Sequence, residues 1–133
     1  NELHKHVGSF VLNLVGGARE TYAKFYEPLE IENGGTGFML IKREVFDLLM
    51  DKVPEYRNDM YSAVQAGDGV KQQMVKEFFA TSIDEDSGDR LLSEDYHFCK
   101  LARKNGIKIY AAPWANLTHS GTYNFSGSLM RHD

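Results

Sequence analysis

Three stretches of the chain repeat apolar residues every three or four positions, which is the spacing of an amphipathic helix. These stretches are residues 3–15, 43–52 and 94–105. Residues that begin or end helices stand beside them. Gly16 follows the first stretch and Pro54 the second, while Ser93 precedes the third as an N-cap and Gly106 follows it. The pattern predicts three helices with these bounds.

Between the predicted helices lie segments rich in aromatic and branched side chains, which favour strands. They are residues 22–31, 38–41, 75–83, 90–92, 107–111 and 116–119. Pro28 makes the first an edge or broken strand. Residues 38–41 lack polar alternation and are predicted to be buried on both faces. Residues 55–71 are predicted to form a loop with some helix. The order favours an α/β or α+β layered fold in one domain over residues 1–133.

Net charge, the length of apolar runs and the cysteine count limit the kinds of molecule and the cellular location expected for this chain. The chain has 133 residues and a formal net charge of -4, which argues against a nucleic-acid partner. No apolar run reaches the roughly 20 residues of a membrane helix, so a soluble protein without a membrane span is expected. The single cysteine, Cys99, excludes an internal disulfide and favours a cytoplasmic location. Its place beside the apolar stripe of the last helix predicts a small core residue.

The first candidate for chemistry is the pair Glu94 and Asp95, at the start of the third predicted helix. Acids in a first helical turn are common because the helix dipole stabilises them, so the pair has a purely structural interpretation. The same position holds a carboxylate ionised and oriented, as a general base requires. The two interpretations are compatible.

The second candidate is His119, at the end of the last predicted strand. A single histidine there has an equally simple interpretation as a packed or surface residue. The polar turn that follows contains Gly121, where the backbone could approach a diphosphate or a divalent ion. Trp114 and Tyr123 could stack on a sugar ring, although core packing explains them as well.

Two further motifs carry weaker information. Gly35, Thr36 and Gly37 form a glycine-rich turn that matches neither the phosphate loop nor the dinucleotide fingerprint, so a tight turn into a buried strand is the structural alternative. Asp84 and Asp86 have the letters of an acidic metal pair. They lie in a polar run between two predicted strands, where a solvated turn is the better interpretation.

Taken in order, three blocks resemble the C-terminal half of GT-A glycosyltransferases, closest to the family-2-like group of bacteria and viruses. They are the glycine-rich turn with residues 36–46, the Ser-Glu-Asp-Tyr-x-Phe-Cys motif of residues 93–99, and His-x-Gly at residues 119–121. The resemblance runs from about residue 35 to residue 129. The order and spacing of the blocks make it more specific than any one block.

The resemblance implies a partial GT-A-like α/β fold, a mixed sheet flanked by helices, and it implies a function and roles for these residues. It implies sugar transfer from a nucleotide-sugar donor to a hydroxyl acceptor, with Asp95 as general base and Glu94 positioning it or binding acceptor. The turn of Gly35, Thr36 and Gly37 would lead a central strand beside the acceptor pocket. His119 would join the metal or diphosphate site, with Mn²⁺ or Mg²⁺ as the cofactor of the complete enzyme.

The chain departs from the family in one respect. The Asp-x-Asp pair and the strand–helix–strand unit of the nucleotide-binding half are absent upstream of residue 33. The expectation is therefore a glycosyltransferase fragment that self-associates to cover exposed sheet. The alternatives are a non-catalytic binding or structural module that kept the acceptor half, and an unrelated α/β domain in which Glu94 and Asp95 only cap a helix.

Overall fold

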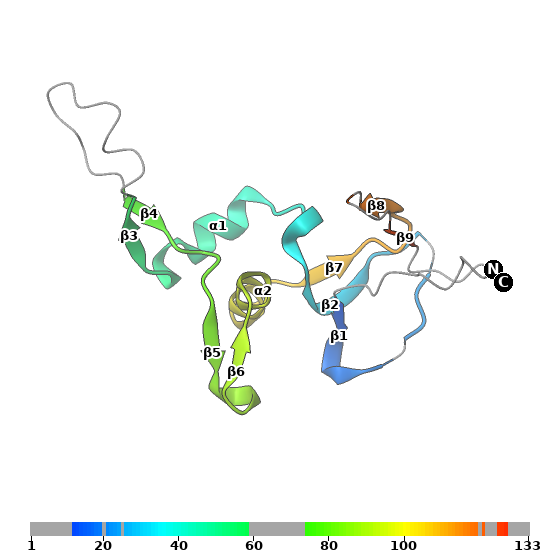
Figure 1. The fold of residues 1–133 in the computed structure, drawn as a ribbon, viewed down its shortest axis with the longest axis horizontal. Coiled ribbons are helices and arrows are strands. Elements are labelled where there is room, and N and C mark those ends of the chain that lie inside the picture. Colours follow the sequence, from blue (N-terminus) through cyan, green and yellow to red (C-terminus); the bar gives the residue numbers. More distant parts are fainter. Residues whose placement is uncertain are drawn as a thin grey trace, which may run out of the picture. The chain divides into compact units, whose positions relative to one another are not determined.

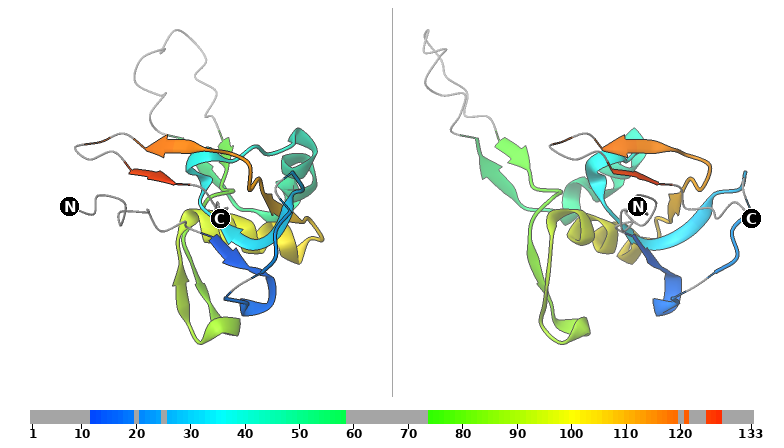
Figure 2. Two further views of the ribbon diagram at one scale, coloured as in Figure 1. Left: turned by 90° about the vertical axis from the view of Figure 1, so that its right-hand side faces the viewer. Right: turned by 45° about the vertical axis from the view of Figure 1, so that its right-hand side comes forward.

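The computed structural model describes residues 12–19, 21–24, 26–58, 74–119, 121 and 125–127. Backbone contacts divide the chain into two compact units. The first unit comprises Asn1–Phe38 and Lys108–Asp133, and the second is Met39–Ile107. The chain therefore leaves the first unit after Phe38 and returns to it at Lys108 (Figures 1 and 2).

The first unit is built on a small antiparallel sheet with β2 in the middle. Its strands are β1 (Leu12–Leu14), β2 (Leu29–Gly34) and β7 (Ile109–Ala111), and a separate pair is formed by β8 (Leu117–His119) and β9 (Phe125–Gly127). Two short 3-10 turns, η2 (Val15–Gly17) and η3 (Thr36–Phe38), follow β1 and β2. Ile31 is the buried apolar residue of β2. Lys108 Nζ bonds the Glu30 carboxylate at 2.9 Å across the sheet.

The predicted helix over residues 3–15 is wrong where the structure describes it, because Leu12–Leu14 is a strand. Pairing with β2 sets Leu14 opposite Ile31, and this tertiary contact overrides the helical spacing of the apolar residues. Residues 1–11 lie outside the described part of the chain. Gly16 and Gly17, which were expected to end that helix, instead belong to η2 after the strand, with φ values of 72° and 70°.

Two predicted strands of the first half are also corrected. The strand expected over residues 22–31 begins only at Leu29, directly after Pro28, and Tyr22 is fully exposed before it. Residues 38–41 are not a strand: Phe38 ends η3, and the side chains of Phe38 and Leu40 are 79% and 100% exposed. Apolar residues form a strand only where a neighbouring strand is available for backbone pairing. The spacing of apolar residues does not show whether such a strand is present.

The second unit contains the two α-helices of the described residues and two hairpins. In chain order its elements are α1 (Arg43–Leu49), η4 (Met50–Lys52), β3 (Glu55–Arg57), β4 (Met74–Lys76), β5 (Ser82–Asp84), η6 (Glu85–Ser87), β6 (Arg90–Leu92) and α2 (Glu94–Lys104). The helix predicted over residues 43–52 is confirmed as α1 and η4. The loop expected from residue 55 instead begins with β3, and the strand expected over residues 75–83 is split into β4 and β5.

Both ends of α2 follow from local sequence. Ser93 is the N-cap residue by backbone conformation, and its carbonyl accepts from His97 N at 2.8 Å. At the other end Gly106 has φ 79°. Ile107 N bonds Ala102 O and Gly106 N bonds Arg103 O, both at 3.0 Å. These two bonds form a Schellman motif, which satisfies the last carbonyls and ends the helix where glycine allows it.

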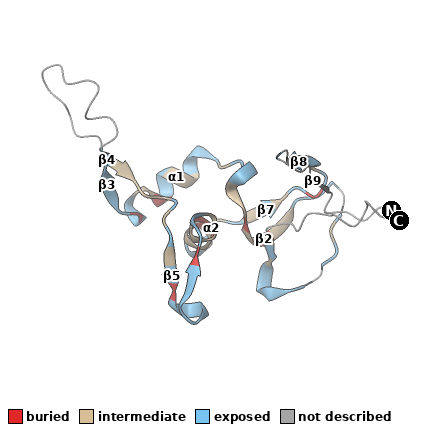
Figure 3. Ribbon diagram, viewed as in Figure 1, coloured by how far each residue is buried: buried red, intermediate tan, exposed pale blue. Residues whose placement is uncertain are grey.

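The core of the second unit gathers on one side of α2. Its buried apolar residues are Leu49, Val53, Leu92, Phe98, Cys99 and Ala102 (red in Figure 3). Phe98 lies in a ring cluster, with centroid distances of 4.6 Å to Phe79 and 6.1 Å to Phe46. Cys99 is fully buried, which confirms it as a small core residue. The described fold is thus mixed α/β with small antiparallel sheets, which confirms the coarse class predicted from the sequence.

Candidate functional site

The candidate base Asp95 is fixed in the first turn of α2. Its Oδ1 accepts hydrogen bonds from the Ser93 hydroxyl and from Tyr96 N, the latter at 2.9 Å. Ser93 therefore uses its hydroxyl to hold Asp95, and makes no side-chain bond to the backbone of the helix. Asp95 is half-buried and Glu94, beside it, is exposed.

The contacts of Asp95 leave one carboxylate oxygen available. Within the described part of the chain, both bonds of Asp95 fall on Oδ1. The Arg90 guanidinium lies 5.6 Å from the Tyr96 ring centroid, so a cation is held over the neighbouring side chain. A carboxylate fixed through one oxygen can accept a proton on the other, which is what a general base requires.

The glycine-rich turn lies in the first unit. Gly34 ends β2, and a Cβ on it would meet Ile31 Cδ1 at 3.0 Å, so packing on the buried Ile31 favours glycine there. Gly35 and Thr36 are half-buried, and Gly37 is exposed with open space around it. The turn leads into η3 and not into the central strand that was expected.

The remaining candidates also belong to the first unit. His119 ends β8, but its side chain lies outside the described residues. Trp114 is 39% exposed and follows the buried Pro113, and Gly121 is exposed. Tyr123 is outside the described residues.

The candidate residues are divided between the two units. Glu94 and Asp95 adjoin on α2 in the second unit, while the glycine-rich turn, Trp114 and His119 belong to the first. Over residues 12–119, apart from the gaps given above, no three His, Cys, Asp or Glu side chains gather as metal ligands.

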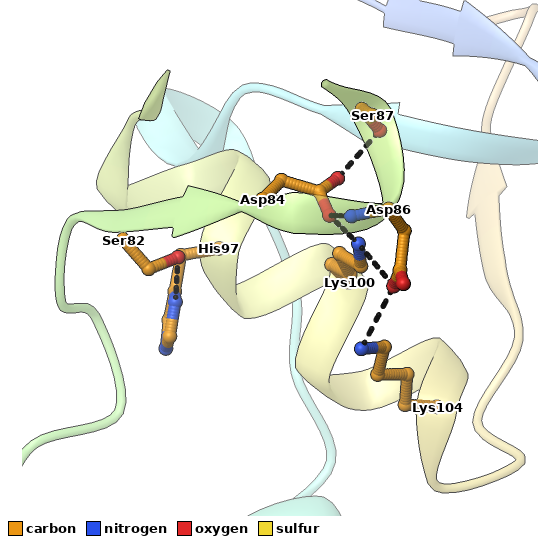
Figure 4. A network of polar contacts seen from close by, with 7 residues as sticks. All are labelled: Ser82, Asp84, Asp86, Ser87, His97, Lys100 and Lys104. Carbon is orange, nitrogen blue, oxygen red and sulfur yellow. Dashed lines mark hydrogen bonds and ion pairs between the residues drawn. The ribbon is translucent and has the colours of Figure 1, made fainter. Parts of the chain in front are cut away.

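Sequence analysis missed an ionic cluster made of Asp84, Asp86, Lys100 and Lys104 (Figure 4). The Lys100 ammonium bonds Asp84 Oδ1 and lies 3.1 Å from Asp86 Oδ2, and Lys104 Nζ lies 3.2 Å from the same Asp86 oxygen. The turn was placed correctly, but Asp84 is not a solvated residue, since it is only 7% exposed. The sequence did contain a signal for this cluster. Lys100 and Lys104 are one turn apart on the predicted helix, and the acidic run of residues 84–89 precedes that helix.

The pKa values of Asp84, Asp86 and Lys100 are shifted by their partners in the cluster. The Lys100 hydrogen bond, with help from the Ser87 hydroxyl, holds the pKa of Asp84 below its usual value. Lys100 and then Lys104 lower the pKa of Asp86. Asp84 in turn raises the pKa of Lys100. All three groups are therefore charged at neutral pH.

A second polar contact joins the same elements. His97 Nδ1 lies 2.7 Å from Ser82 Oγ, across from α2 to the start of β5. Burial lowers the pKa of His97, against the weaker opposing effect of the Glu77 charge. A neutral imidazole can either donate to or accept from the hydroxyl, so the contact is satisfied at neutral pH.

Comparisons with known proteins add no family. No protein-family model, no curated protein and no solved structure matches this chain. None of the described helices is both long enough and apolar enough to cross a membrane.

Proposed function

We propose that this chain is the acceptor-side part of a GT-A-type glycosyltransferase, in which Asp95 is the general base. The observation that carries the proposal is the geometry of Asp95, a carboxylate anchored through Oδ1 at a helix start. The order of the three sequence motifs supports it. In this account Glu94, exposed beside Asp95, contacts the acceptor.

The chemistry assigned to Asp95 is one proton transfer. An acceptor hydroxyl is a poor nucleophile until its proton leaves, and Asp95 Oδ2 takes that proton as the oxygen attacks the anomeric carbon. The bond from that carbon to the nucleoside diphosphate breaks, with inversion, and the diphosphate leaves with the bonding electrons. Positioned bases of this kind contribute about 10²- to 10⁴-fold to a rate.

On the donor side of the site, the proposal assigns a role only to a divalent cation and to His119. A divalent cation would neutralise the charge of the leaving diphosphate. An imidazole suits Mn²⁺ or Mg²⁺ only as one ligand among oxygens, so His119 would supply a single ligand to a site completed by other groups. The metal has no part in the proton transfer that is assigned to Asp95.

Calorimetric titration with UDP and GDP, with and without Mn²⁺, tests the donor side of the proposal. We expect metal-dependent binding that weakens in His119→Ala and is unchanged in Thr118→Ala, a matched change on the same strand. Glycan binding by a chain that neither binds nucleotide nor transfers sugar would contradict the proposal. It would favour the non-catalytic acceptor-binding module.

A further inference from the structure

The hairpin of β5, η6 and β6, residues 82–92, lies on α2 across a hollow of about 320 Å³. Hairpin and helix both line the hollow, with Ser82, Ile83, Asp84, Glu85, Asp86 and Leu92 on one side and His97, Lys100, Leu101 and Lys104 on the other. The two strands run side by side in every view, with η6 at the far end (Figures 1 and 2). All of these residues belong to the second unit.

The base of the hairpin is fastened to the unit by neutral contacts. Ser82 and Leu92 are cross-strand partners at this end. Leu92 is 6% exposed, and Ser82 Oγ contacts His97 Nδ1 at 2.7 Å. Apolar burial of this kind is not weakened by salt.

The tip of the hairpin is fastened by charge. It contacts α2 through the ion pairs of Asp84 and Asp86 with Lys100 and Lys104. Arg90, the strand partner of Asp84, also lies over the ring of Tyr96 on α2. Between base and tip, Ile83 and its partner Leu91 are more exposed than buried, at 58% and 66%. Each end of the hairpin has one buried residue, Leu92 of β6 at the base and Asp84 of β5 at the tip (red in Figure 3).

The tip also has internal bonds that keep its shape. Asp84 accepts from Ser87 Oγ at 2.7 Å and from Asp86 N at 3.2 Å. Gly88 continues the turn with φ 73° and bonds Glu85 O. These bonds lie within the hairpin and do not depend on α2, so the hairpin can move as one piece.

From this arrangement we infer that residues 82–92 form a lid, hinged at the Ser82–Leu92 end and latched at its tip by Lys100 and Lys104, and that release of the latch opens the hollow. Salt screens the exposed pairs of Asp86 most strongly and the buried Asp84–Lys100 pair less, whereas the apolar contacts of the base are not screened. The lid is closed at neutral pH and low ionic strength, where Asp84, Asp86 and Lys100 are charged and their ion pairs are not screened.

The experiment measures the distance between lid tip and helix. A nitroxide is attached to Glu85→Cys, and the broadening of the α2 amide signals is recorded by NMR. The native Cys99 is fully buried, so the unsubstituted chain, which takes up no label, is the control for labelling. Strong broadening at Lys100 and Lys104 reports the closed lid.

Lys100→Met is compared with Lys76→Met in the labelled protein. The two lysine side chains are equally exposed, at 26% and 24%, but Lys76 pairs with Glu55 in the other hairpin. We expect Lys100→Met to reduce the broadening severalfold and Lys76→Met to leave it unchanged. Broadening that survives in Lys100→Met would overturn the latch.

Salt provides a second arm that needs no further substitution. At about 1 M NaCl the Debye length is about 3 Å, and we expect broadening in the labelled parent to fall while the core signals stay in place. If Lys100→Met does not fold, this arm decides the matter. Broadening unchanged between low and high salt would show that the exposed ion pairs of Asp86 do not latch the tip.

Discussion

The regions around Asp84 and Asp95 use the same functional group in opposite ways. Asp84 is 7% exposed, and its two oxygens are occupied by Lys100, Ser87 and Asp86 N. Asp95 is half-buried and is held through Oδ1 alone, by Ser93 and Tyr96 N. The number of oxygens already occupied, and the presence of a cation, separates a carboxylate that holds structure from one that is poised to accept a proton.

The largest structural effect should come from removing the cation beside Asp84. Lys100→Met leaves a buried carboxylate without its partner, which costs more than the pair itself contributes. We expect the melting temperature, followed by circular dichroism, to fall by several degrees. Adding Asp84→Asn to the same chain should recover much of the loss. An unchanged melting temperature in Lys100→Met would show that Asp84 does not depend on its cation, and would contradict the contrast drawn between Asp84 and Asp95.

The dependence of stability on low pH tests whether Asp84 is held by its charged partners. The pKa values of Asp84 and Asp86 are lowered from 3.8 in the folded protein, so their stabilisation is complete above that value and is lost as the pH falls through the lower folded values. His97 adds a separate loss that begins as the pH drops below 6.5, because its folded pKa is also lowered and the unfolded chain takes up the proton first.

Urea unfolding at a series of pH values between 7 and 3 measures both losses. We expect Asp84→Asn to reduce the acidic loss and His97→Gln to remove the one near pH 6. An acid profile that is identical in parent and Asp84→Asn would show that the carboxylate is not held by its partners.

Gly106→Ala supplies a destabilised control that touches neither acid. Gly106 ends α2 with φ 79°, where a Cβ costs roughly 1–2 kcal/mol although the space around it is open. We expect a lower free energy of unfolding in urea, with normal acid dependence and normal sugar transfer. Lost transfer in this variant would mean that activity follows overall stability and does not depend on Asp95 specifically.

The smallest effect is expected from Ser93→Ala. The Ser93 hydroxyl donates to Asp95 Oδ1, so its loss loosens the carboxylate without removing it. Sugar transfer should fall by less than about tenfold, since one positioning hydrogen bond is worth about 1 kcal/mol, and the melting temperature should change little. An effect as large as that of removing the carboxylate would assign the hydroxyl a direct part in the chemistry.

The sequence predicted what depends on neighbouring residues. The bounds of α2 follow from Ser93 and Gly106, and the turn after β5 from its acidic run, because caps and turns are local. It missed what depends on distant partners. Leu12–Leu14 became a strand through pairing with β2, and the contact of Lys100 with Asp84 joins residues 16 positions apart. The position of Asp95 was predictable, but the single oxygen that fixes it was not.

The most direct test of the account compares Asp95→Asn with Asp84→Asn using two readouts, sugar transfer from nucleotide-sugar donors and thermal melting. Both changes remove a charge and keep the shape of the side chain. We predict that Asp95→Asn lowers transfer by about 10²- to 10⁴-fold at an unchanged melting temperature. Asp84→Asn should lower the melting temperature and retain transfer. Full transfer in Asp95→Asn would contradict the assignment of Asp95 as the base, and with it the proposed function.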